Sequence, residues 1–151
     1  MWLRTECGNM DCMRIDDAAI DAIRDLYDDL GIDGSVLDLG GAGEEHFNLP
    51  PDELTVAEAP EGEYDDVVYF GAPDDGELFA AVARVLRPGG RFVVTFTNRL
   101  APDTAAQVRR LRKRFDSTPG FGPAESDLRT SLKGEGDQLW AVWAKRADPS
   151  P

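Results

Sequence analysis

A short apolar run that ends in a cluster of glycines constrains this chain more than any other feature. The run is Ser35 to Leu39, and Gly40-Gly41-Ala42-Gly43 follows it at once. A run this short, bounded by turn residues, predicts a buried strand rather than a helix. Glycine tolerates backbone conformations and close approaches that a Cβ atom forbids, so the cluster predicts a tight turn. In open α/β sheets, such a turn at the carboxyl end of a strand is where ligands bind.

Further strands and helices alternate along the chain. Strands are predicted over 54–58, 64–70 and 91–97. One helix is capped by Asp16 or Asp17 and ends at Gly31; a second runs from Asp74-Asp75 to Pro88-Gly89-Gly90, which stops it; a third starts at Pro102. The inner side of the third helix is expected to carry Ala105, Val108, Leu111 and Phe115. The alternation predicts an α/β fold, a mostly parallel sheet with helices on both faces.

The end of the domain is predicted to be an antiparallel hairpin. A strand near 127–132 leads through the turn Gly134-Glu135-Gly136 to a final strand over 138–145. Leu139, Ala141 and Trp143 alternate with Trp140 and Val142, so both faces of this strand are apolar and we expect it inside the sheet. The chain is divided into an N-terminal segment (1–14), one domain (15–146) and a disordered tail (147–151).

Three stretches, in this order, resemble class I S-adenosylmethionine-dependent methyltransferases. Val36 to Gly43 resembles the family's first motif, usually VLDLGCGxG. Tyr64 to Val68 looks like its fourth strand, and Leu86 to Val94 looks like the helix end and fifth strand that follow. Ile15 to Ile20 and Thr97 to Arg99 are also similar to a narrower group of methyltransferase-like proteins. The resemblance covers roughly residues 15 to 146 and implies a Rossmann-like sheet with an antiparallel C-terminal hairpin.

The resemblance also implies a cofactor, S-adenosylmethionine, and a set of residues that bind it. In the family, an acid at the end of the first strand lies near the methionine moiety, and an acid at the end of the second holds the ribose hydroxyls. The residues implied are Asp38, Gly40, Gly41, Gly43 and Glu58. Methyl transfer depends chiefly on aligning the nucleophile with the methyl carbon, so the sequence names no catalytic residue.

The sequence departs from the family pattern in two places. Ala42 and Glu44 replace the second and third motif glycines. Only Ala59 to Glu63 separate Glu58 from Tyr64, where the family has a helix, a strand and an acidic loop. A parallel crossover normally needs a dozen or more residues. We therefore expect either a displaced second strand or a hairpin turn at Pro60-Glu61-Gly62, and part of the usual second half-site to be lacking.

Two functions remain open for the glycine turn. The first is an S-adenosylmethionine-dependent methyltransferase acting on an unknown substrate. The second is a non-catalytic binding or dimerisation module that keeps the turn from an ancestral binding fold. NAD binding is a weaker third reading, since the GxGxxG pattern loses its last glycine at His46. His46 itself could act in acid–base chemistry, but a partly exposed helical histidine is the simpler expectation.

Other polar residues have a structural and a functional interpretation. Asn98-Arg99 follows the fifth-strand motif and could orient a substrate anion, or simply form a strand-to-helix loop. Asp65 and Asp66 precede a buried strand and are expected to hold the strand entrance. The cations at 109, 110 and 112–114 crowd one helix end, where the helix dipole favours them. The same cluster could instead bind an anion, a partner or the acidic surface of another copy.

The composition indicates which environment and which partners to expect. The formal net charge is −13, from 29 acidic and 16 basic residues. Such a charge repels phosphates, so duplex DNA or RNA is not an expected partner. It suits a proteome kept in high salt, where self-repulsion is screened. No apolar run approaches the ~20 residues of a membrane span, and we expect a cytoplasmic protein. A single histidine excludes a multi-histidine metal site.

The charge predicts that folding requires salt. Unscreened repulsion destabilises a compact acidic domain, and ~0.1 M salt already shortens the screening length to ~10 Å. The melting temperature, followed by circular dichroism from low to molar salt, should therefore rise. A melting temperature that is flat or falls with added salt would contradict this interpretation of the charge.

Overall fold

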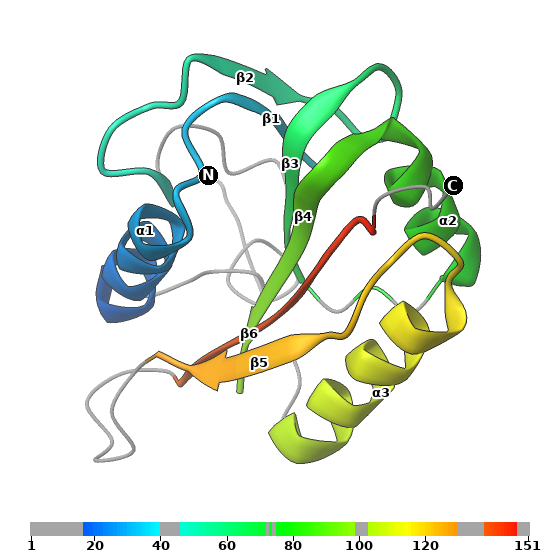
Figure 1. The fold of residues 1–151 in the computed structure, drawn as a ribbon. Coiled ribbons are helices and arrows are strands. Elements are labelled where there is room, and N and C mark those ends of the chain that lie inside the picture. Colours follow the sequence, from blue (N-terminus) through cyan, green and yellow to red (C-terminus); the bar gives the residue numbers. More distant parts are fainter. Residues whose placement is uncertain are drawn as a thin grey trace, which may run out of the picture.

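The computed structural model describes residues 17–39, 46–71, 73, 75–98, 103–129 and 138–147. In these ranges the elements are α1 (Asp17–Leu30), β1 (Ser35–Asp38), β2 (Glu53–Val56), β3 (Tyr64–Phe70), α2 (Gly76–Val85), β4 (Leu86–Thr97), α3 (Thr104–Ser117), β5 (Glu125–Leu128) and β6 (Leu139–Lys145). The strands form a six-stranded sheet in the order β2-β1-β3-β4-β6-β5, drawn in Figure 1. This is the α/β, Rossmann-like architecture predicted from the sequence.

The sheet is parallel from β2 to β4 and antiparallel at its C-terminal end. β1 pairs in parallel with β2 and β3, and β3 pairs in parallel with β4. β6 runs antiparallel to β4 on one side and to β5 on the other, so the prediction of an interior final strand is confirmed. Its alternation is also as expected, because Leu139 and Ala141 face one core cluster and Val142 the other.

Helices cover both faces of the sheet (Figure 1). On one face, α1 presents the buried stripe of Ile23, Leu26 and Tyr27. It ends at Gly31, whose φ of +72° suits glycine. On the other face, α2 and α3 bring Phe79 and Phe115 against Phe92 of β4. These three rings meet edge to face with centroids 5.0 to 5.7 Å apart, the geometry that aromatic pairs prefer.

Three predicted boundaries differ from the structure. The predicted stop at Pro88-Gly89-Gly90 is wrong, because α2 ends at Val85 and β4 begins at Leu86. The backbone after Leu86 already pairs with β3, through a register shift before Arg91. Gly90 permits this, since a Cβ there would lie 2.3 Å from the Asp65 carbonyl oxygen. β5 covers 125–128, earlier than predicted, and the expected turn Gly134-Glu135-Gly136 lies outside the described residues.

The inner face of α3 differs from the prediction at one position. Leu111 and Phe115 are buried as expected and Val108 is half-buried, but Ala105 is exposed. Gln107 is buried in its place. The helical spacing of apolar residues alone does not predict that Ala105 is exposed. Gln107 can be buried because its Oε1 accepts hydrogen bonds from Arg110.

The path from β2 to β3 is neither of the two expected alternatives. β2 lies beside β1 and parallel to it, and residues 57–63 then lead to the start of β3 on the far side of β1. The strand ends at Val56, two residues earlier than predicted, so the connection is longer than the sequence suggested. Fully extended, residues 57–63 span roughly 27 Å. The distance from the end of β2 to the start of β3, two strand spacings across and one strand length back, is only ~16 Å.

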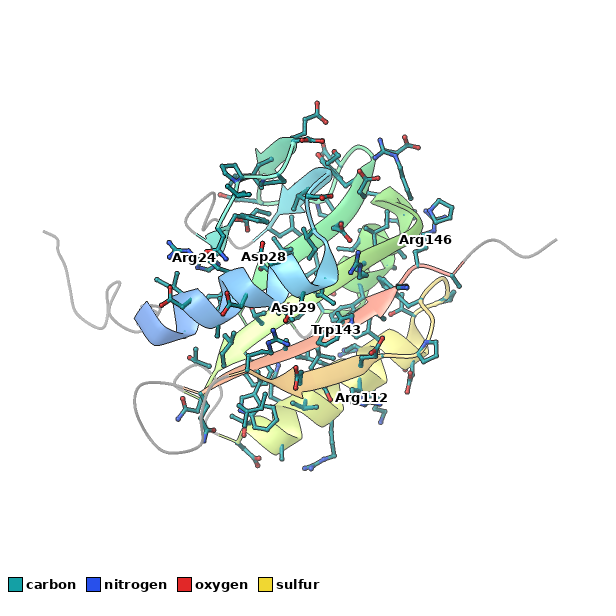
Figure 2. All side chains as sticks on the ribbon, turned by 60° about the vertical axis from the view of Figure 1, so that its left-hand side comes forward. Arg24, Asp28, Asp29, Arg112, Trp143 and Arg146 are labelled. Carbon is teal, nitrogen blue, oxygen red and sulfur yellow. The ribbon has the colours of Figure 1, made fainter. Side chains whose placement is uncertain are left out.

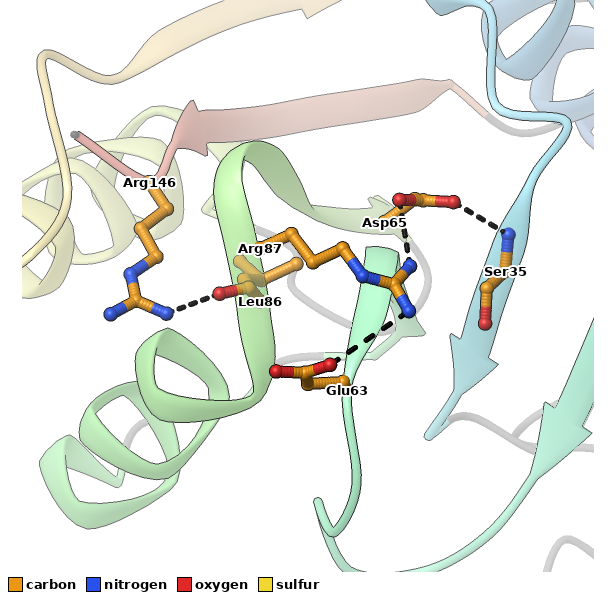
Figure 3. A network of polar contacts seen from close by, with 6 residues as sticks. All are labelled: Ser35, Glu63, Asp65, Leu86, Arg87 and Arg146. Atoms are coloured by element: carbon orange, nitrogen blue, oxygen red, sulfur yellow. Dashed lines mark hydrogen bonds and ion pairs between the residues drawn. The ribbon is translucent and has the colours of Figure 1, made fainter.

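A polar network holds the entrances of the parallel strands together (Figure 3). Asp65 accepts a hydrogen bond from the Ser35 backbone N–H at 3.0 Å and another from Arg87 Nη1 at 2.8 Å. These two hydrogen bonds lower the pKa of Asp65 below its ordinary value. Arg146 donates to the Leu86 carbonyl oxygen at the same end of the sheet. The expected role of Asp65 at the strand entrance is therefore confirmed.

Asp66, the next residue, holds the same entrance from a buried position. Its Oδ1 accepts a hydrogen bond from the Arg91 backbone N–H at 3.1 Å, with the Arg91 Nε at 3.4 Å. Burial raises the pKa of Asp66 from 3.8 to about 6, against the opposing effect of Arg91. The folded protein therefore binds a proton at Asp66 more tightly than the unfolded chain does.

This pKa predicts a stability change of definite sign. Between about pH 4 and pH 6 only the folded state keeps the Asp66 proton, so stability falls as the pH rises through this window. Asp66→Asn removes this dependence while keeping an acceptor for Arg91. The unfolding free energy of wild type minus that of the variant should fall by up to about 3 kcal/mol from pH 4 to pH 7.

Asp65→Asn serves as a control, because its effect on stability should change with pH in the opposite direction. Because the pKa of Asp65 is lowered, its stabilisation is lost as the pH falls, so the difference between wild type and this variant should increase with pH. Urea denaturation at several pH values measures both differences. If the Asp66→Asn difference stays flat or rises, the buried carboxylate is not destabilised by burial.

Candidate functional site

The carboxyl ends of β1 and β2 bring two of the expected site residues to one edge of the sheet. Asp38 is the last residue of β1 and is level with Val56, the last residue of β2. The Ala57 N–H still donates to the Asp38 carbonyl oxygen at 3.1 Å, and Glu58 follows directly. Asp38 and Glu58 therefore stand at the ends of neighbouring parallel strands. Gly40, Gly41 and Gly43 lie outside the described residues.

The two carboxylates have different surroundings. Glu58 is exposed, whereas only 3% of Asp38 is accessible to solvent. Asp38 shares the α1 face with Tyr27, whose hydroxyl is buried. Burial, with a smaller contribution from the Asp38 charge, raises the pKa of Tyr27 far above its ordinary value, while neighbouring Thr95 acts in the opposite direction. Asp38 thus belongs to a buried cluster of polar side chains with Tyr27 and Thr95, whereas the Glu58 carboxylate faces solvent.

His46 is buried, so the expectation of a partly exposed histidine is wrong. It is 4% exposed and its ring meets Phe70 at the end of β3, edge to face, with centroids 5.8 Å apart. The next residue, Phe47, packs against Tyr27 at 4.9 Å. Residues 46 and 47 therefore pack against α1 and β3. The polarity of their neighbours in the sequence does not predict this burial. His46 lies at the same edge as Asp38.

Two buried hydroxyls at the end of β4 were not anticipated from the sequence. Thr95 and Thr97 are at most 1% exposed; Thr95 hydrogen-bonds to Tyr27, whereas the Thr97 Oγ1 has no hydrogen-bond partner among the described residues. They alternate with Val94 and Phe96, which enter the opposite core, so both face the α1 side. The available signal was a polar side chain at every second position of an otherwise apolar strand. An unmade buried hydrogen bond is unfavourable by ~1–3 kcal/mol.

The pair Asn98-Arg99, a further candidate from the sequence, is described only in part. Asn98 links β4 to β6, because its Oδ1 accepts from the Gln138 N–H at 3.0 Å and its own N–H donates to Gln138. Arg99 lies outside the described residues.

Within the described ranges, no group of His, Cys, Asp and Glu side chains could hold a metal ion. None of the described helices is long and apolar enough to cross a membrane.

The chemistry of this edge suits a particular kind of ligand. Glu58 offers an exposed carboxylate that can accept two hydrogen bonds from a vicinal diol. Asp38 adds a second negative charge close by, which favours a cationic ligand group. A molecule that carries a ribose together with ammonium and sulfonium charges fits these hydrogen-bond acceptors.

Comparison with known proteins bears on the fold. No protein-family model and no curated protein sequence matches the chain. Among solved structures, it is similar to an O-methyltransferase from Bacillus cereus in complex with S-adenosylhomocysteine, with a TM-score of 0.55, 10% identity, and coverage of 93% of this chain and 86% of that one. A methyltransferase from Pyrococcus furiosus matches with a TM-score of 0.54, 13% identity, and coverage of 83% and 82%.

A third similar structure is a phosphoethanolamine N-methyltransferase 2 from Haemonchus contortus, in complex with phosphomonomethylethanolamine and S-adenosylhomocysteine. Its TM-score is 0.56 at 14% identity, and the match covers 88% of this chain but 39% of that one. At such identities the likeness concerns the fold. The strand order, the antiparallel β6 and these similarities together show that the chain has the class I methyltransferase fold.

The unpartnered hydroxyl of Thr97 predicts a stabilising substitution. Valine has nearly the same shape but no polar atom to bury, so Thr97→Val should raise the unfolding free energy by about 1 kcal/mol or more. Thr97→Ser, which keeps the hydroxyl and loses a methyl group, should lower it instead. Chemical denaturation of the three proteins measures this. A Thr97→Val variant less stable than wild type would mean that the hydroxyl is well bonded in the folded protein.

Proposed function

We propose that this protein is an S-adenosylmethionine-dependent methyltransferase whose cofactor site lies at the carboxyl ends of β1 and β2. The observation that carries the proposal is the placement of Asp38 and Glu58 at the ends of adjacent parallel strands. The glycine cluster follows the first of these strands in the sequence. Ligands of open α/β sheets bind at this kind of edge. The fold shared with methyltransferases that bind S-adenosylhomocysteine adds support.

The residues at this edge would take different roles toward the cofactor. Glu58 is exposed, so its carboxylate can accept hydrogen bonds from the ribose hydroxyls. Asp38 is buried beside Tyr27, and its charge would favour the positively charged methionine end of the cofactor. Gly40, Gly41 and Gly43 would let the cofactor approach the backbone. When bound, S-adenosylmethionine supplies an electrophilic methyl group, and the protein's part is to align it with an acceptor.

One observation favours a second candidate, a non-catalytic module with the same fold. The connection over 57–63 carries no helix or strand, and β2 is an edge strand of the sheet. Val56 at its end is 52% exposed. In the family that this chain resembles, additional structure in this place helps to enclose the adenine. An open edge therefore predicts weak cofactor affinity and is compatible with a descendant that has lost it.

Calorimetric titration with S-adenosylmethionine and S-adenosylhomocysteine distinguishes the two candidates. We expect wild type to bind both. A charge-assisted hydrogen bond contributes roughly 1.5–3 kcal/mol, so Glu58→Gln should weaken binding by about tenfold or more. Glu125→Gln, the same change on exposed β5 at the opposite edge of the sheet, should leave the affinity unchanged. Gly40→Val should abolish binding, because the resemblance implies that the cofactor approaches the backbone at this glycine.

Each negative result points to a different conclusion. If wild type shows neither heat nor a thermal shift at millimolar ligand, the methyltransferase proposal fails and the non-catalytic module takes its place. If wild type binds and Glu58→Gln binds equally well, the ribose lies elsewhere. Circular dichroism of every variant, recorded in high-salt buffer, confirms that the comparison is between folded proteins.

A further inference from the structure

Helix α3 displays a concentrated positive charge on a strongly acidic protein. Four cations of its middle part, Arg109, Arg110, Arg112 and Lys113, are exposed. The buried side of the helix carries Gln107, Leu111 and Phe115, so Arg109 and Lys113 form the outermost row. We call these four cations the basic face. Like charges at i, i+3 and i, i+4 destabilise a helix, so this crowding is locally unfavourable.

Among the described residues, the basic face makes no close ion pair. Arg24, Arg87, Arg91 and Arg129 each lie within ion-pair distance of a carboxylate. Within the part of the chain that the structure describes, no carboxylate lies that close to any cation of the basic face. The chain carries 29 acidic residues, so a shortage of carboxylates does not explain this.

Neutral groups hold two of these cations in place. Arg110 donates from Nε and Nη2 to the Gln107 Oε1, at 3.1 and 2.7 Å. Arg112 donates from Nη1 to the Ser126 hydroxyl at 3.2 Å. A neutral acceptor fixes the guanidinium without cancelling its charge. The basic face is therefore partly ordered in advance for an anionic partner, which reduces the entropy lost on binding.

The opposite side of the same molecule carries a matching acidic helix surface. Asp21, Asp25 and Asp28 of α1 are exposed and recur at intervals of four and three residues, on the side away from the buried stripe. We call these three carboxylates the acidic face; Asp21 within it also accepts from Arg24 Nη1 at 3.3 Å, an exposed ion pair of little energetic weight. Asp28 is held by a neutral group, since it accepts from Asn48 Nδ2 at 2.7 Å. Both faces repeat their charges at helical spacing, and both helices span fourteen residues.

We infer that the acidic face of one copy docks on the basic face of a second copy. Within one molecule the two cannot meet, because α1 and α3 cover opposite faces of the sheet. Figure 2 shows α1 with Asp28 and Asp29 in front of the sheet and Arg112 on α3 beyond it. The contact is head to tail, so a dimer keeps a free basic face on one copy and a free acidic face on the other, and association can continue beyond a dimer.

Nucleic acid is the less fitting occupant of the basic face. Proteins that bind duplexes commonly make ~6–10 phosphate contacts, and the four cations of this face supply fewer. The net charge of −13 also opposes a polyanion of high charge density. The one aromatic residue of α3, Phe115, is buried and cannot stack on a base. A short row of carboxylates on a helix matches the number and spacing of the cations better.

The experiment uses sedimentation equilibrium of two charge-reversed variants, alone and mixed. Arg109→Glu with Lys113→Glu removes the basic face, and Asp21→Lys with Asp25→Lys removes the acidic face. In ~0.1 M salt, where contacts survive but long-range repulsion is screened, the wild-type average mass should rise with concentration above the monomer value of 16.5 kDa. Molar salt should reverse the rise. Each variant alone should stay monomeric, because one half of the contact is missing.

The mixture is the decisive sample. The first variant keeps an acidic face and the second keeps a basic face, and their two reversed faces also carry opposite charges, so an equimolar mixture should associate above the monomer mass. A control that reverses Glu61 and Glu125, two exposed acids off α1, changes the net charge as the second variant does and should associate like wild type. A monomeric wild type at millimolar concentration would overturn the proposal. So would a monomeric mixture, or binding of a labelled RNA duplex in preference to self-association.

Discussion

The structure depends on the pairing of β1 on both of its sides. This four-residue strand lies between β2 and β3, parallel to both, and is buried along most of its length. Its start is fixed by the hydrogen bond from Ser35 to Asp65, and its end by the pairing of Asp38 with Val56 and Val68. Because both neighbours hold its register, a slip by one residue would turn Asp38 toward the opposite face.

Polar groups are treated differently at the two ends of the parallel strands. At the entrances, Asp65 and Arg87 satisfy each other and the Ser35 N–H, and the result is a structural clamp. At the carboxyl ends, Asp38, Tyr27 and the two threonines of β4 are buried on the α1 side, and the Thr97 Oγ1 has no hydrogen-bond partner among the described residues. Buried polar groups that are incompletely bonded reduce stability, and proteins retain such features mainly at functional sites.

The distribution of charge adds a second level of organisation. Screening over ~10 Å separates the acidic surface of α1 from the cations of α3, since a sheet and two layers of side chains lie between them. Each helix then behaves toward a partner according to its own local charge rather than the total of −13. This is the physical reason why a net acidic protein can present a cationic surface, and why composition alone says little about where a partner docks.

The class of fold and the order of its elements follow from the sequence alone. The strand at 64–70, the stripe of α1 and the interior final strand follow from the period of apolar residues, because burial on a strand or a helix imposes that period. The sequence also predicted strands that end near Asp38 and Glu58, whereas the parallel pairing of β1 with β2 came from the structure.

Only the tertiary structure decided the path between β2 and β3, the burial of His46 and Gln107, and the two hydroxyls of β4 that face α1. These features arise from contacts between residues distant in sequence, such as His46 with Phe70, which local patterns do not encode.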